Sequence, residues 1–519
     1  MNRGIAIQHL IRMSKEGFNI TSWFFENARK SPNTVAIIEG HKQVTFGELE
    51  KMVIDTCIYF RKKEIGKGDR VLIFVPMGID LYRIVLSLFH IGAVAVFLDE
   101  WVSKARMEEC CRVAPCKGFI GISKAHILRW FSSELRKIPV VLRIKHNATG
   151  NQKLAFENTI TDDTALITFT TGSTGTPKAA KRTHGLLNEQ FIALREKINP
   201  KAGDADMTLL PIVLLINLGT GVTSVIAKFK AAKPKTFKPS LLISQIKQHK
   251  INRITASPYF IKCLSQHLIA TGIHLPEIKQ VFTGGAPVFP GEAALYNKAF
   301  GEADVQIVYG STEAEPISSL SGNLLQHTDS MRGLWVGKPY HKTEVKIIAI
   351  SNQEIILKAG ETLTNLRPGE VGEITVAGPH VLKEYINNPD AVRRNKILEN
   401  GKIYHRTGDS GFVDEEGNLF LCGRCATIIP FEGEPVYPFI CENFIQSVNG
   451  ITIGTVMLLE GRLMVVAESE NQALRQSQRA ALMKMKPTPA DVLFVKNIPR
   501  DPRHNSKIDY EKLRKNLTA

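Results

Sequence analysis

Between residues 170 and 178, hydroxyl side chains and glycines alternate and end at a lysine, a combination that can bind phosphate. This run, Thr170-Thr-Gly-Ser-Thr-Gly-Thr-Pro-Lys178, follows an apolar stretch at 165–170 that predicts a buried strand. Glycine lets backbone N–H groups approach a polyphosphate, hydroxyls add donors, and lysine supplies a positive charge. The candidate phosphate contacts are Thr170, Thr171, Gly172, Ser173, Thr174, Gly175, Thr176 and Lys178.

The run is not a Walker loop, because that loop needs a glycine directly before its lysine and a hydroxyl residue directly after it. Here Pro177 precedes Lys178 and Ala179 follows it. A plain Gly/Ser/Thr turn at the end of the strand is the alternative for this run taken alone.

Four further segments of the sequence contain a tight glycine turn or charged side chains that could take part in chemistry. Phe282-Thr-Gly-Gly-Ala-Pro287 ends a predicted strand in a tight Gly-Gly turn, which alone is ordinary turn chemistry. Tyr309-Gly-Ser-Thr-Glu313 offers a carboxylate oxygen, the ligand that a hard cation such as Mg²⁺ prefers. Thr407-Gly-Asp409 is followed by a hairpin turn at 414–417 and by Gly423-Arg424. The fourth segment runs from Pro499 to Lys507.

Taken in this order and at these spacings, the five segments resemble the signature motifs of the acyl-adenylate-forming superfamily, which includes acyl-CoA synthetases, peptide-synthetase adenylation domains and luciferases. The resemblance implies that the chain binds ATP with Mg²⁺ and joins a carboxylic acid to AMP. It also implies that CoA can serve as the acceptor in a second step.

The resemblance assigns a role to each motif residue. The turn Gly284, Gly285, Ala286 and Pro287 is expected along the adenine ring, and Tyr309, next to Gly310 and Ser311, is expected to stack on it. Asp409 is expected to accept hydrogen bonds from both ribose hydroxyls, with Arg424 near the ribose or the phosphates. Glu313 and Thr174 are the expected metal ligands. The expected catalytic residues are Lys507, Glu313 and Thr312, with Lys507 reaching the α-phosphate and the substrate carboxylate.

The sequence departs from the family pattern at several positions. Ala179 and Ser506 stand where the family carries glycine, and Thr171 stands where it carries serine. The family's hinge lies two residues past the arginine of the Gly-Arg motif and is commonly Asp or Lys, whereas this chain has Ala426 there. A small residue can absorb a hinge change in backbone angles. The resemblance therefore supports formation of the acyl-AMP more directly than it supports the later transfer of the acyl group to CoA.

The segment Leu210-Pro-Ile-Val-Leu-Leu-Ile-Asn-Leu-Gly219 lies where many relatives carry a histidine near the acyl group, and here it is aliphatic. An aliphatic lining favours an acyl chain over an amino acid, whose ammonium would need a charged partner. This segment and Arg503-His-Asn-Ser-Lys507 resemble one branch, the fatty-acid-CoA-ligase-like enzymes of long-chain olefin biosynthesis. Those enzymes convert 3-hydroxy acids to β-lactones through an adenylate and need no CoA.

The prediction from the sequence is ATP-dependent activation of a medium- or long-chain fatty acid as acyl-AMP, followed by transfer to CoA. The first alternative is CoA-independent closure of a 3-hydroxy acyl-AMP to a β-lactone. The second, from another class, is a non-catalytic nucleotide or acyl binder, which the full set of motifs disfavours. Only twelve residues follow Lys507, which disfavours a peptide-synthetase module with its own carrier domain.

The 519-residue composition indicates a globular chain, since 44% of residues are hydrophobic and 22% are charged. Its net charge of +16 suits anionic partners. A basic run at Lys228, Lys230, Lys233, Lys235 and Lys238 includes Phe229 and Phe237, and we expect either a solvated loop or a peripheral membrane contact there. No nucleic-acid motif accompanies this run, so no nucleic-acid partner is expected.

The sequence also predicts the cellular location of the protein. The first residues form no apolar export signal, and the eight cysteines form no disulfide framework, so a cytoplasmic protein is expected. The apolar windows 81–98 and 209–227 contain Arg83, His90 and the helix breakers Gly92 and Gly219, which favour buried helix and strand pieces over membrane spans. Cys422 and Cys425 flank the Gly-Arg motif and are expected to be packing residues.

Alternating strand and helix patterns predict an α/β fold. Residues 1–423 are expected to form a large, multi-subdomain adenylate-forming domain. Residues 424–519 are expected to form a small, mobile α+β lid that carries Lys507. Strands are predicted at 72–75 and 93–98, and Thr45 is a predicted helix cap.

Overall fold

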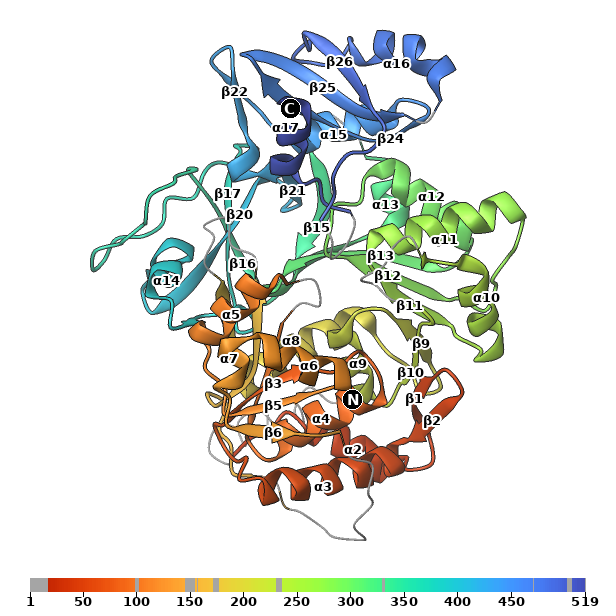
Figure 1. Cartoon of the computed structure of the whole chain (residues 1–519). Helices are drawn as coiled ribbons and strands as arrows, with labels where there is room; N and C mark the ends of the chain where they lie inside the picture. The colour runs from red at the N-terminus through yellow and green to blue at the C-terminus, as the bar shows by residue number, and fades with distance from the viewer. Residues whose placement is uncertain are drawn as a thin grey trace.

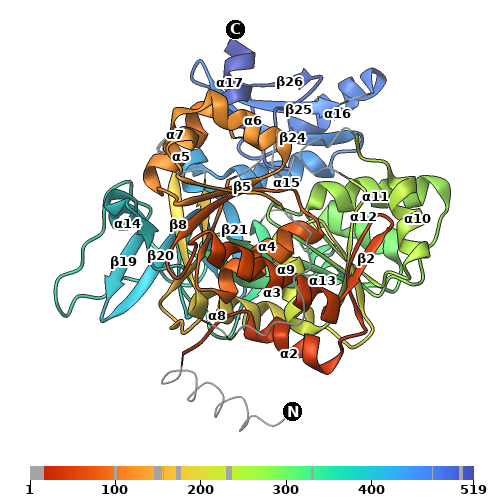
Figure 2. The same ribbon diagram turned by 60° about the horizontal axis from the view of Figure 1, so that its bottom comes forward.

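The computed structural model describes residues 17–98, 102–144, 155, 157–170, 177–229, 236–328, 332–469, 471–501 and 506–518. Two large sheets with their helices form the body of the molecule, and a small sheet near the C-terminus lies above them (Figures 1 and 2). The predicted α/β fold, with a large N-terminal part and a small C-terminal part, is confirmed.

The larger sheet contains fourteen strands in the order β16-β17-β20-β21-β15-β14-β13-β12-β11-β9-β10-β1-β2, with β19 beside β20. Its strands β9, β11, β12 and β13 pair in parallel, whereas β13, β14, β15 and β21 pair antiparallel. The strands are β1 (Val35–Glu39), β2 (Lys42–Thr45), β9 (Ala205–Thr208), β10 (Thr223–Ile226), β11 (Arg253–Ala256), β12 (Gln280–Gly284), β13 (Asp304–Ser311), β14 (Ala314–Ser321), β15 (Leu334–Pro339), β16 (Glu344–Ile348), β17 (Gly372–Ala377), β19 (Lys396–Glu399), β20 (Lys402–Val413) and β21 (Leu419–Arg424).

The second sheet has seven strands in the order β18-β8-β7-β4-β3-β5-β6. Its apolar strands β3 to β7 pair in parallel and β7 turns back antiparallel into β8. The strands are β3 (Arg70–Phe74), β4 (Val94–Phe97), β5 (Gly118–Gly121), β6 (Val140–Leu142), β7 (Thr164–Thr170), β8 (Lys178–Thr183) and β18 (Tyr385–Ile386). The strands predicted at 165–170, 72–75 and 93–98 are thus confirmed as β7, β3 and β4.

Most helices of the large part begin in one of two ways. Either a side chain accepts a hydrogen bond from an unpaired backbone N–H of the first turn, or a proline, which has no N–H, is the first residue. Proline is the first residue of α9, α10, α11, α12 and α14. Thr45 forms a capping box with Glu48 at the start of α3, as predicted. The helices are α2 (Ser22–Lys30), α3 (Phe46–Lys62), α4 (Ile79–His90), α5 (Lys104–Val113), α6 (Ser123–Phe131), α7 (Ser133–Arg136), α8 (His184–Ile198), α9 (Pro211–Thr220), α10 (Pro239–Gln248), α11 (Pro258–Thr271), α12 (Pro290–Phe300), α13 (Gly322–Leu325) and α14 (Pro389–Asn395).

The two apolar windows are buried helix and strand pieces, as predicted. The first contains α4 and β4, and the second contains α9 and β10. Gly219 does not break its helix, however: α9 continues to Thr220 and ends where Gly221 adopts a left-handed conformation, with φ of 80°. A side chain at Gly219 would meet the Phe191 ring at 2.5 Å, so this glycine serves packing. Among the described residues, no helix is long and apolar enough to cross a membrane.

After Arg424 the chain leaves the larger sheet and forms the C-terminal part. Two core clusters hold these elements together: one includes Val436, Ile445, Val465 and Leu482, and the other includes Met457, Val466, Ile498 and Leu513. The predicted boundary between residues 423 and 424 stays a prediction. The elements are η3 (Cys425–Thr427), β22 (Ile429–Phe431), β23 (Glu434–Val436), α15 (Pro438–Ser447), β24 (Ile451–Leu459), β25 (Arg462–Ser469), η4 (Gln472–Leu474), α16 (Arg475–Leu482), β26 (Asp491–Val495) and α17 (Tyr510–Thr518).

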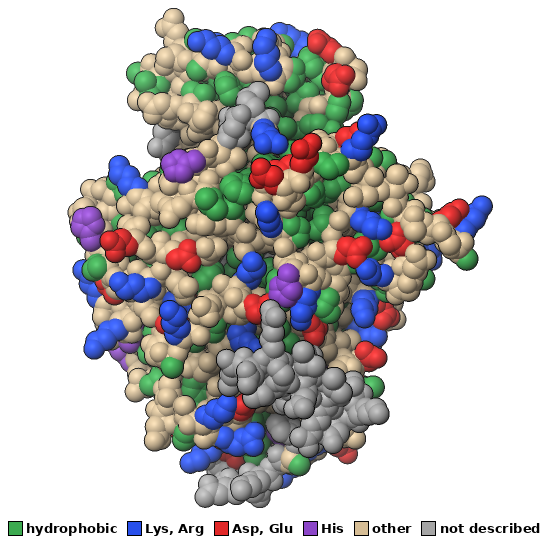
Figure 3. Space-filling model, turned by 180° about the vertical axis from the view of Figure 1, so that it is seen from behind, with side chains coloured by type: hydrophobic (Ala, Val, Ile, Leu, Met, Phe, Trp, Pro, Cys, Tyr) green, Lys and Arg blue, Asp and Glu red, His purple; other side chains and the backbone are tan. Residues whose placement is uncertain are grey.

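The face seen in Figure 3 shows no single large patch of basic side chains, because its Lys and Arg side chains lie among Asp and Glu side chains. The two aromatic residues of the basic run turn inward: the rings of Phe229 and Phe237 pack edge-on against each other, and both contact the Phe260 ring. Lys230, Lys233 and Lys235 lie outside the described residues.

Candidate active site

A cavity of about 2680 Å³ lies between the large part and the C-terminal part of the molecule. Residues of the last four of the five predicted motifs line this cavity. The two described ends of the first motif, Thr170 and Lys178, line it as well. The described motif residues along the cavity are Thr170, Lys178, Gly284, Gly285, Ala286, Pro287, Tyr309, Gly310, Ser311, Thr312, Glu313, Asp409, Arg424 and Lys507. Thr171, Gly172, Ser173, Thr174, Gly175 and Thr176 lie outside the described residues.

Glu313 lies between the antiparallel strands β13 and β14 of the larger sheet, and its carboxylate faces residues of the seven-stranded sheet. Its Oε1 atom accepts hydrogen bonds from the Thr170 hydroxyl at 3.3 Å and from the Tyr385 hydroxyl at 3.1 Å. Its backbone carbonyl accepts from the Leu382 amide at 2.7 Å. No hydrogen bond from the described residues reaches the second carboxylate oxygen, Oε2. Glu313 is therefore held from three sides while one oxygen keeps its acceptor capacity.

Two ammonium groups flank the Tyr385 ring behind Glu313. The Nζ of Lys178 lies 5.8 Å from the ring centroid and the Nζ of Lys396 lies 5.4 Å from it. Burial lowers the pKa of Lys178, and the charge of Glu313 partly opposes this. Burial lowers the pKa of Lys396 further, to about 7, and its ammonium donates to the Leu382 carbonyl. Near neutral pH the Lys396 side chain is therefore only partly charged, so Lys178 supplies the more persistent positive charge beside the Glu313 carboxylate.

The Gly-Gly turn at the end of β12 is required by the sheet itself. A Cβ on Gly284 would lie 2.3 Å from the Val308 carbonyl oxygen of the neighbouring strand β13. Gly285 has φ of 83°, a left-handed conformation that favours glycine. Because these glycines have no side chains, the end of β12 can lie close to the backbone of β13. The turn that follows β12 also lines the cavity. The predicted contact of this turn with adenine stays a prediction.

Asp409 lies in β20 directly opposite Arg424 in β21. One carboxylate oxygen of Asp409 accepts from the Arg424 guanidinium at 2.7 Å, and the other accepts from the Tyr309 hydroxyl at 2.8 Å. The Asp409 charge raises the pKa of Arg424. Burial and the same charge raise the pKa of Tyr309 well above its usual value, so its hydroxyl stays protonated. A carboxylate has about four acceptor positions, so this arrangement leaves capacity for further donors such as hydroxyls.

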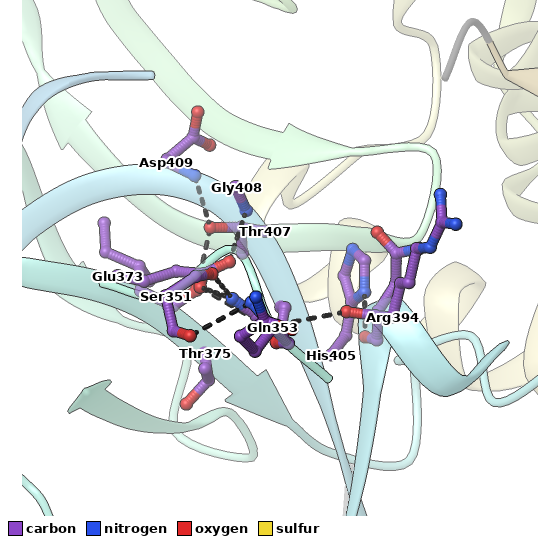
Figure 4. Close-up of polar contacts among 12 residues, drawn as sticks. Ser351, Gln353, Glu373, Thr375, Arg394, His405, Thr407, Gly408 and Asp409 are labelled. Atoms are coloured by element: carbon purple, nitrogen blue, oxygen red, sulfur yellow. Dashed lines mark hydrogen bonds and ion pairs between the residues drawn. The ribbon is translucent and has the colours of Figure 1, made fainter. Parts of the chain in front are cut away.

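A buried ion pair supports the Thr407-Gly408-Asp409 segment from beneath (Figure 4). The Arg406 guanidinium donates to Glu373 at 2.5 Å through one nitrogen and at 2.9 Å through another, and it also donates to the backbone carbonyls of Gln353 and Ser351. The other Glu373 oxygen accepts from the Gly408 amide at 3.3 Å. Glu373 therefore connects Arg406 to the backbone that carries Asp409.

Lys507 reaches the cavity from the C-terminal part. Its amide donates to the Asp501 carboxylate at 2.9 Å, and its carbonyl accepts from the Asp501 amide at 2.8 Å, so Lys507 is held next to Asp501. The predicted hinge residue Ala426 is exposed, lies in the 3-10 turn η3 and also lines the cavity. Cys422 packs with Phe412 and Phe420, as predicted for a packing residue.

The predicted acyl segment also lines the cavity. Leu210, Pro211, Ile212, Val213 and Leu215 face it from the start of α9. Tyr82 fixes this helix, because its hydroxyl donates to the Pro211 carbonyl at 3.0 Å. Further apolar side chains on this wall are Val75, Met77, Leu81, Val85, Tyr259, Phe260 and Phe282. The charged motif residues and the aliphatic side chains of α9 therefore line the same cavity.

Comparison with known proteins identifies the family to which this chain belongs. Residues 24–386 match the AMP-binding enzyme family, so the chain belongs to this family. The chain is accordingly an AMP-forming acid ligase, and family membership implies that it uses ATP and a carboxylic acid.

Relatives cover nearly the whole chain. It is 30% identical over 488 residues to an olefin beta-lactone synthetase of Stenotrophomonas maltophilia (strain K279a), with 86% of each chain covered. It is 25% identical over 436 residues to a feruloyl-CoA synthase of Amycolatopsis sp, with 83% of each covered.

Solved structures share the fold. O-succinylbenzoate coenzyme A synthetase (MenE) from Bacillus subtilis, in complex with AMP, has a TM-score of 0.77 and 22% identity and covers 96% of this chain and 98% of its own. Amide bond synthetase McbA from Marinactinospora thermotolerans has a TM-score of 0.79 and 21% identity and covers 96% of this chain and 99% of its own. Both likenesses concern the fold.

Sequence reasoning missed four residues that hold the motif residues in place: Tyr385, Lys396, Glu373 and Arg406. A lone tyrosine or lysine between motifs gives no signal by itself. Arg406 does lie next to the Thr407-Gly-Asp409 motif, but its burial and its pairing with Glu373 become visible only once β20 is placed beside β17.

Proposed function

We propose that this enzyme activates an apolar 3-hydroxy carboxylic acid with ATP and closes the resulting acyl-AMP to a β-lactone without CoA. The observation that carries the first half is that charged motif residues and aliphatic side chains line the same cavity. The second half is supported by the similarity to olefin beta-lactone synthetases, which spans 86% of the chain.

In the first step the substrate carboxylate attacks the α-phosphorus of ATP and pyrophosphate leaves. The protein positions the groups and offsets negative charge. We assign the ribose to Asp409, the adenine to Tyr309 and the turn at Gly284, and the outer phosphates to the loop that ends at Lys178. Lys507 enters from the C-terminal part to stabilise the transition state.

The residues around Glu313 fit a divalent cation. Glu313, whose Oε2 accepts no hydrogen bond from the described residues, lines the same cavity as Lys178, Arg424 and Lys507, which suits a cation shared between one carboxylate and phosphate oxygens. Mg²⁺ bound there, with Thr174 as the second proposed ligand, would neutralise phosphate charge. Tyr385 and Lys396 position the Glu313 carboxylate.

In the second step the 3-hydroxyl oxygen of the acid attacks the acyl carbon of its own adenylate. A carbon–oxygen bond closes the four-membered ring, the bond from the acyl carbon to the phosphate oxygen breaks, AMP leaves and the hydroxyl proton is released. The product weighs one water less than the acid. Ala426 at the hinge position and the aliphatic α9 wall agree with this route.

Transfer of the acyl group to CoA is the second candidate, because CoA synthetases are among the relatives. We also propose that residues 1–423 and 424–519 act as two units about Ala426. The acyl chain is proposed to be of medium or long length because of the apolar wall.

Acid-dependent exchange of pyrophosphate into ATP tests the first half of the proposal. The purified chain is given straight-chain acids of rising length, their 3-hydroxy counterparts and amino acids. We expect exchange that increases with chain length and is absent with amino acids. Glu313→Gln should abolish it, whereas Glu384→Gln, a change at a more exposed glutamate beside Tyr385, should not. ATP binding without exchange for any acid would instead support a non-catalytic binder.

A further inference from the structure

Helix α6 presents its large apolar side chains to solvent. Trp130 is 73% exposed, Phe131 66% and Ile127 52%, and all three lie on one side of the helix because they are spaced by three and four residues. The opposite side buries only Ala125 completely. This arrangement is the reverse of a surface helix that packs its apolar face inward.

A basic surrounding accompanies this apolar face. The segment 102–144, which contains α5, α6 and α7, carries nine Lys and Arg residues against three Glu. All three glutamates are engaged locally: Glu134 by Lys137 and Arg112, Glu109 by Arg106, and Glu108 by the Ser132 hydroxyl. Lys124 and Arg136 are exposed. The segment that carries the exposed aromatic pair therefore keeps an excess of positive charge, although Lys117 is paired with Asp69 outside it.

The same helix reaches the cavity at its other end. Ile122, Lys124, Ala125 and Leu128 line the cavity, next to the apolar wall residues that follow β3. In both ribbon views α5, α6 and α7 lie together at the surface, with α6 next to the strand β5 that precedes it (Figures 1 and 2). One short helix thus connects an exposed apolar patch to the apolar part of the cavity.

We propose that the outer face of α6, formed by Ile127, Trp130 and Phe131, docks on an anionic phospholipid bilayer and delivers the acid from that surface. Tryptophan and phenylalanine rings insert at the headgroup level of a bilayer, and Lys and Arg are attracted to anionic lipids. The proposal that α6 docks on a membrane is supported by its exposed apolar side chains and by the positive charge of the segment that contains it. The proposal that it delivers an apolar acid rests on the proposed function. This surface differs from the basic run at Lys228, whose phenylalanines pack inward.

Vesicle co-sedimentation of the full chain tests docking. We expect sedimentation with vesicles of phosphatidylcholine and phosphatidylserine, weaker sedimentation with phosphatidylcholine alone, and weakening by salt. The double variant Trp130→Glu/Phe131→Glu should bind about tenfold more weakly or worse. The matched control Ile356→Glu/Leu398→Glu changes two exposed apolar residues elsewhere and should bind like the wild type.

Two readouts separate docking from misfolding and from the chemistry. Binding should shift the tryptophan emission of the wild type to shorter wavelength, and Trp130→Phe should still bind but lose most of this shift. Pyrophosphate exchange with a short, water-soluble acid should be equal in the wild type and the Glu double variant. If no acid supports exchange in either protein, the proposed function fails whatever the vesicles show.

Three outcomes would overturn docking. The wild type could fail to sediment with anionic vesicles. The Glu double variant could sediment as well as the wild type. The double variant could convert an oligomer to a monomer while vesicle binding is absent in both, which would assign the patch to a second copy of the chain.

Discussion

At the scale of single residues, the least expected feature is the support of Glu313. Its carboxylate accepts from Thr170 of the second sheet and from Tyr385 of β18, although these residues are far apart in sequence. Lys396 fixes the other side of this group by donating to the carbonyl of Leu382, whose amide binds the Glu313 backbone. A carboxylate held in this way loses little freedom when it binds a cation.

Removing the Tyr385 hydroxyl tests this support. Tyr385→Phe keeps the ring but loses one hydrogen bond to a charged acceptor, which is worth about 1.5–3 kcal/mol. We expect slower adenylation, a higher Mg²⁺ concentration for half-maximal exchange, and a loss of unfolding free energy of at most about 3 kcal/mol. Tyr340→Phe, which removes a similar hydrogen bond to Glu196, is the matched control and should leave the Mg²⁺ dependence unchanged. Equal Mg²⁺ curves for all three proteins would exclude a positioning role for Tyr385.

Lys507 gives the second prediction at this scale. Lys507→Ala should slow pyrophosphate exchange by several orders of magnitude, because a preformed positive charge at the transition state is lost. The affinity for ATP should be nearly intact, since the residue arrives from the C-terminal part. Equilibrium binding of ATP and the exchange rate measure the two effects separately. An exchange rate close to that of the wild type would remove Lys507 from the mechanism.

The motif residues could be predicted from the sequence because each motif keeps its chemistry within a few consecutive residues. The described ones do line a single cavity. Tyr385 and Lys396 could not be predicted, because their position depends on the pairing of β18 with β8 and on the burial of β19. A two-residue strand that pairs with a partner two hundred residues earlier leaves no periodic signal.

At the scale of elements, the adjacent strands β17 and β20 combine to hold the segment that carries Asp409. Glu373 from β17 and Arg406 from the neighbouring strand β20 are both buried and form an ion pair, although the residue directly opposite Arg406 is Thr375. Breaking a buried pair by removing one partner costs about 3–5 kcal/mol, because the other charge stays buried.

Arg406→Met should therefore destabilise the protein by about this amount and raise the KM for ATP. The KM should rise because Glu373 no longer holds the Gly408 amide in place. Urea unfolding and exchange kinetics measure the two effects. Arg253→Met breaks another buried pair, with Asp204, and should destabilise the fold without raising the KM. An unchanged KM in the Arg406 variant would show that the pair serves stability alone.

Strands and helix starts were predictable from local patterns, as β7, β3 and the Thr45 cap show. Helix ends were less so. Gly219 reads as a breaker, yet it remains helical because its missing side chain leaves room for the Phe191 ring. Tertiary packing decided between two uses of the same residue, and a single sequence does not contain that information.

At the scale of the whole molecule, the C-terminal part carries a buried carboxyl group. Glu442 of α15 accepts hydrogen bonds from the hydroxyls of Thr455 and Tyr510, and burial raises its pKa from 4.5 to about 7. In the unfolded chain Glu442 loses its proton near pH 4.5, whereas in the folded chain it keeps the proton up to about pH 7. Its contribution to stability therefore falls as pH rises between these values and is constant above them.

Replacing Glu442 by Gln should remove this pH dependence. Glu442→Gln should be more stable than the wild type at pH 8, by an amount on the order of 3 kcal/mol, and similar to it near pH 4.5. The free energy of unfolding, measured in urea for both proteins from pH 5 to 8, gives the difference. A difference that does not change with pH would contradict the raised pKa.

The central claim is that the acyl-AMP closes on its own 3-hydroxyl. The most direct measurement is mass spectrometry of the products formed from Mg·ATP and a long-chain 3-hydroxy acid, with and without CoA, beside the plain acid of equal length. We predict a product lighter than the 3-hydroxy acid by one water, formed equally with and without CoA and absent for the plain acid. A thioester formed from both acids only when CoA is present would contradict the claim and make the enzyme an acyl-CoA synthetase.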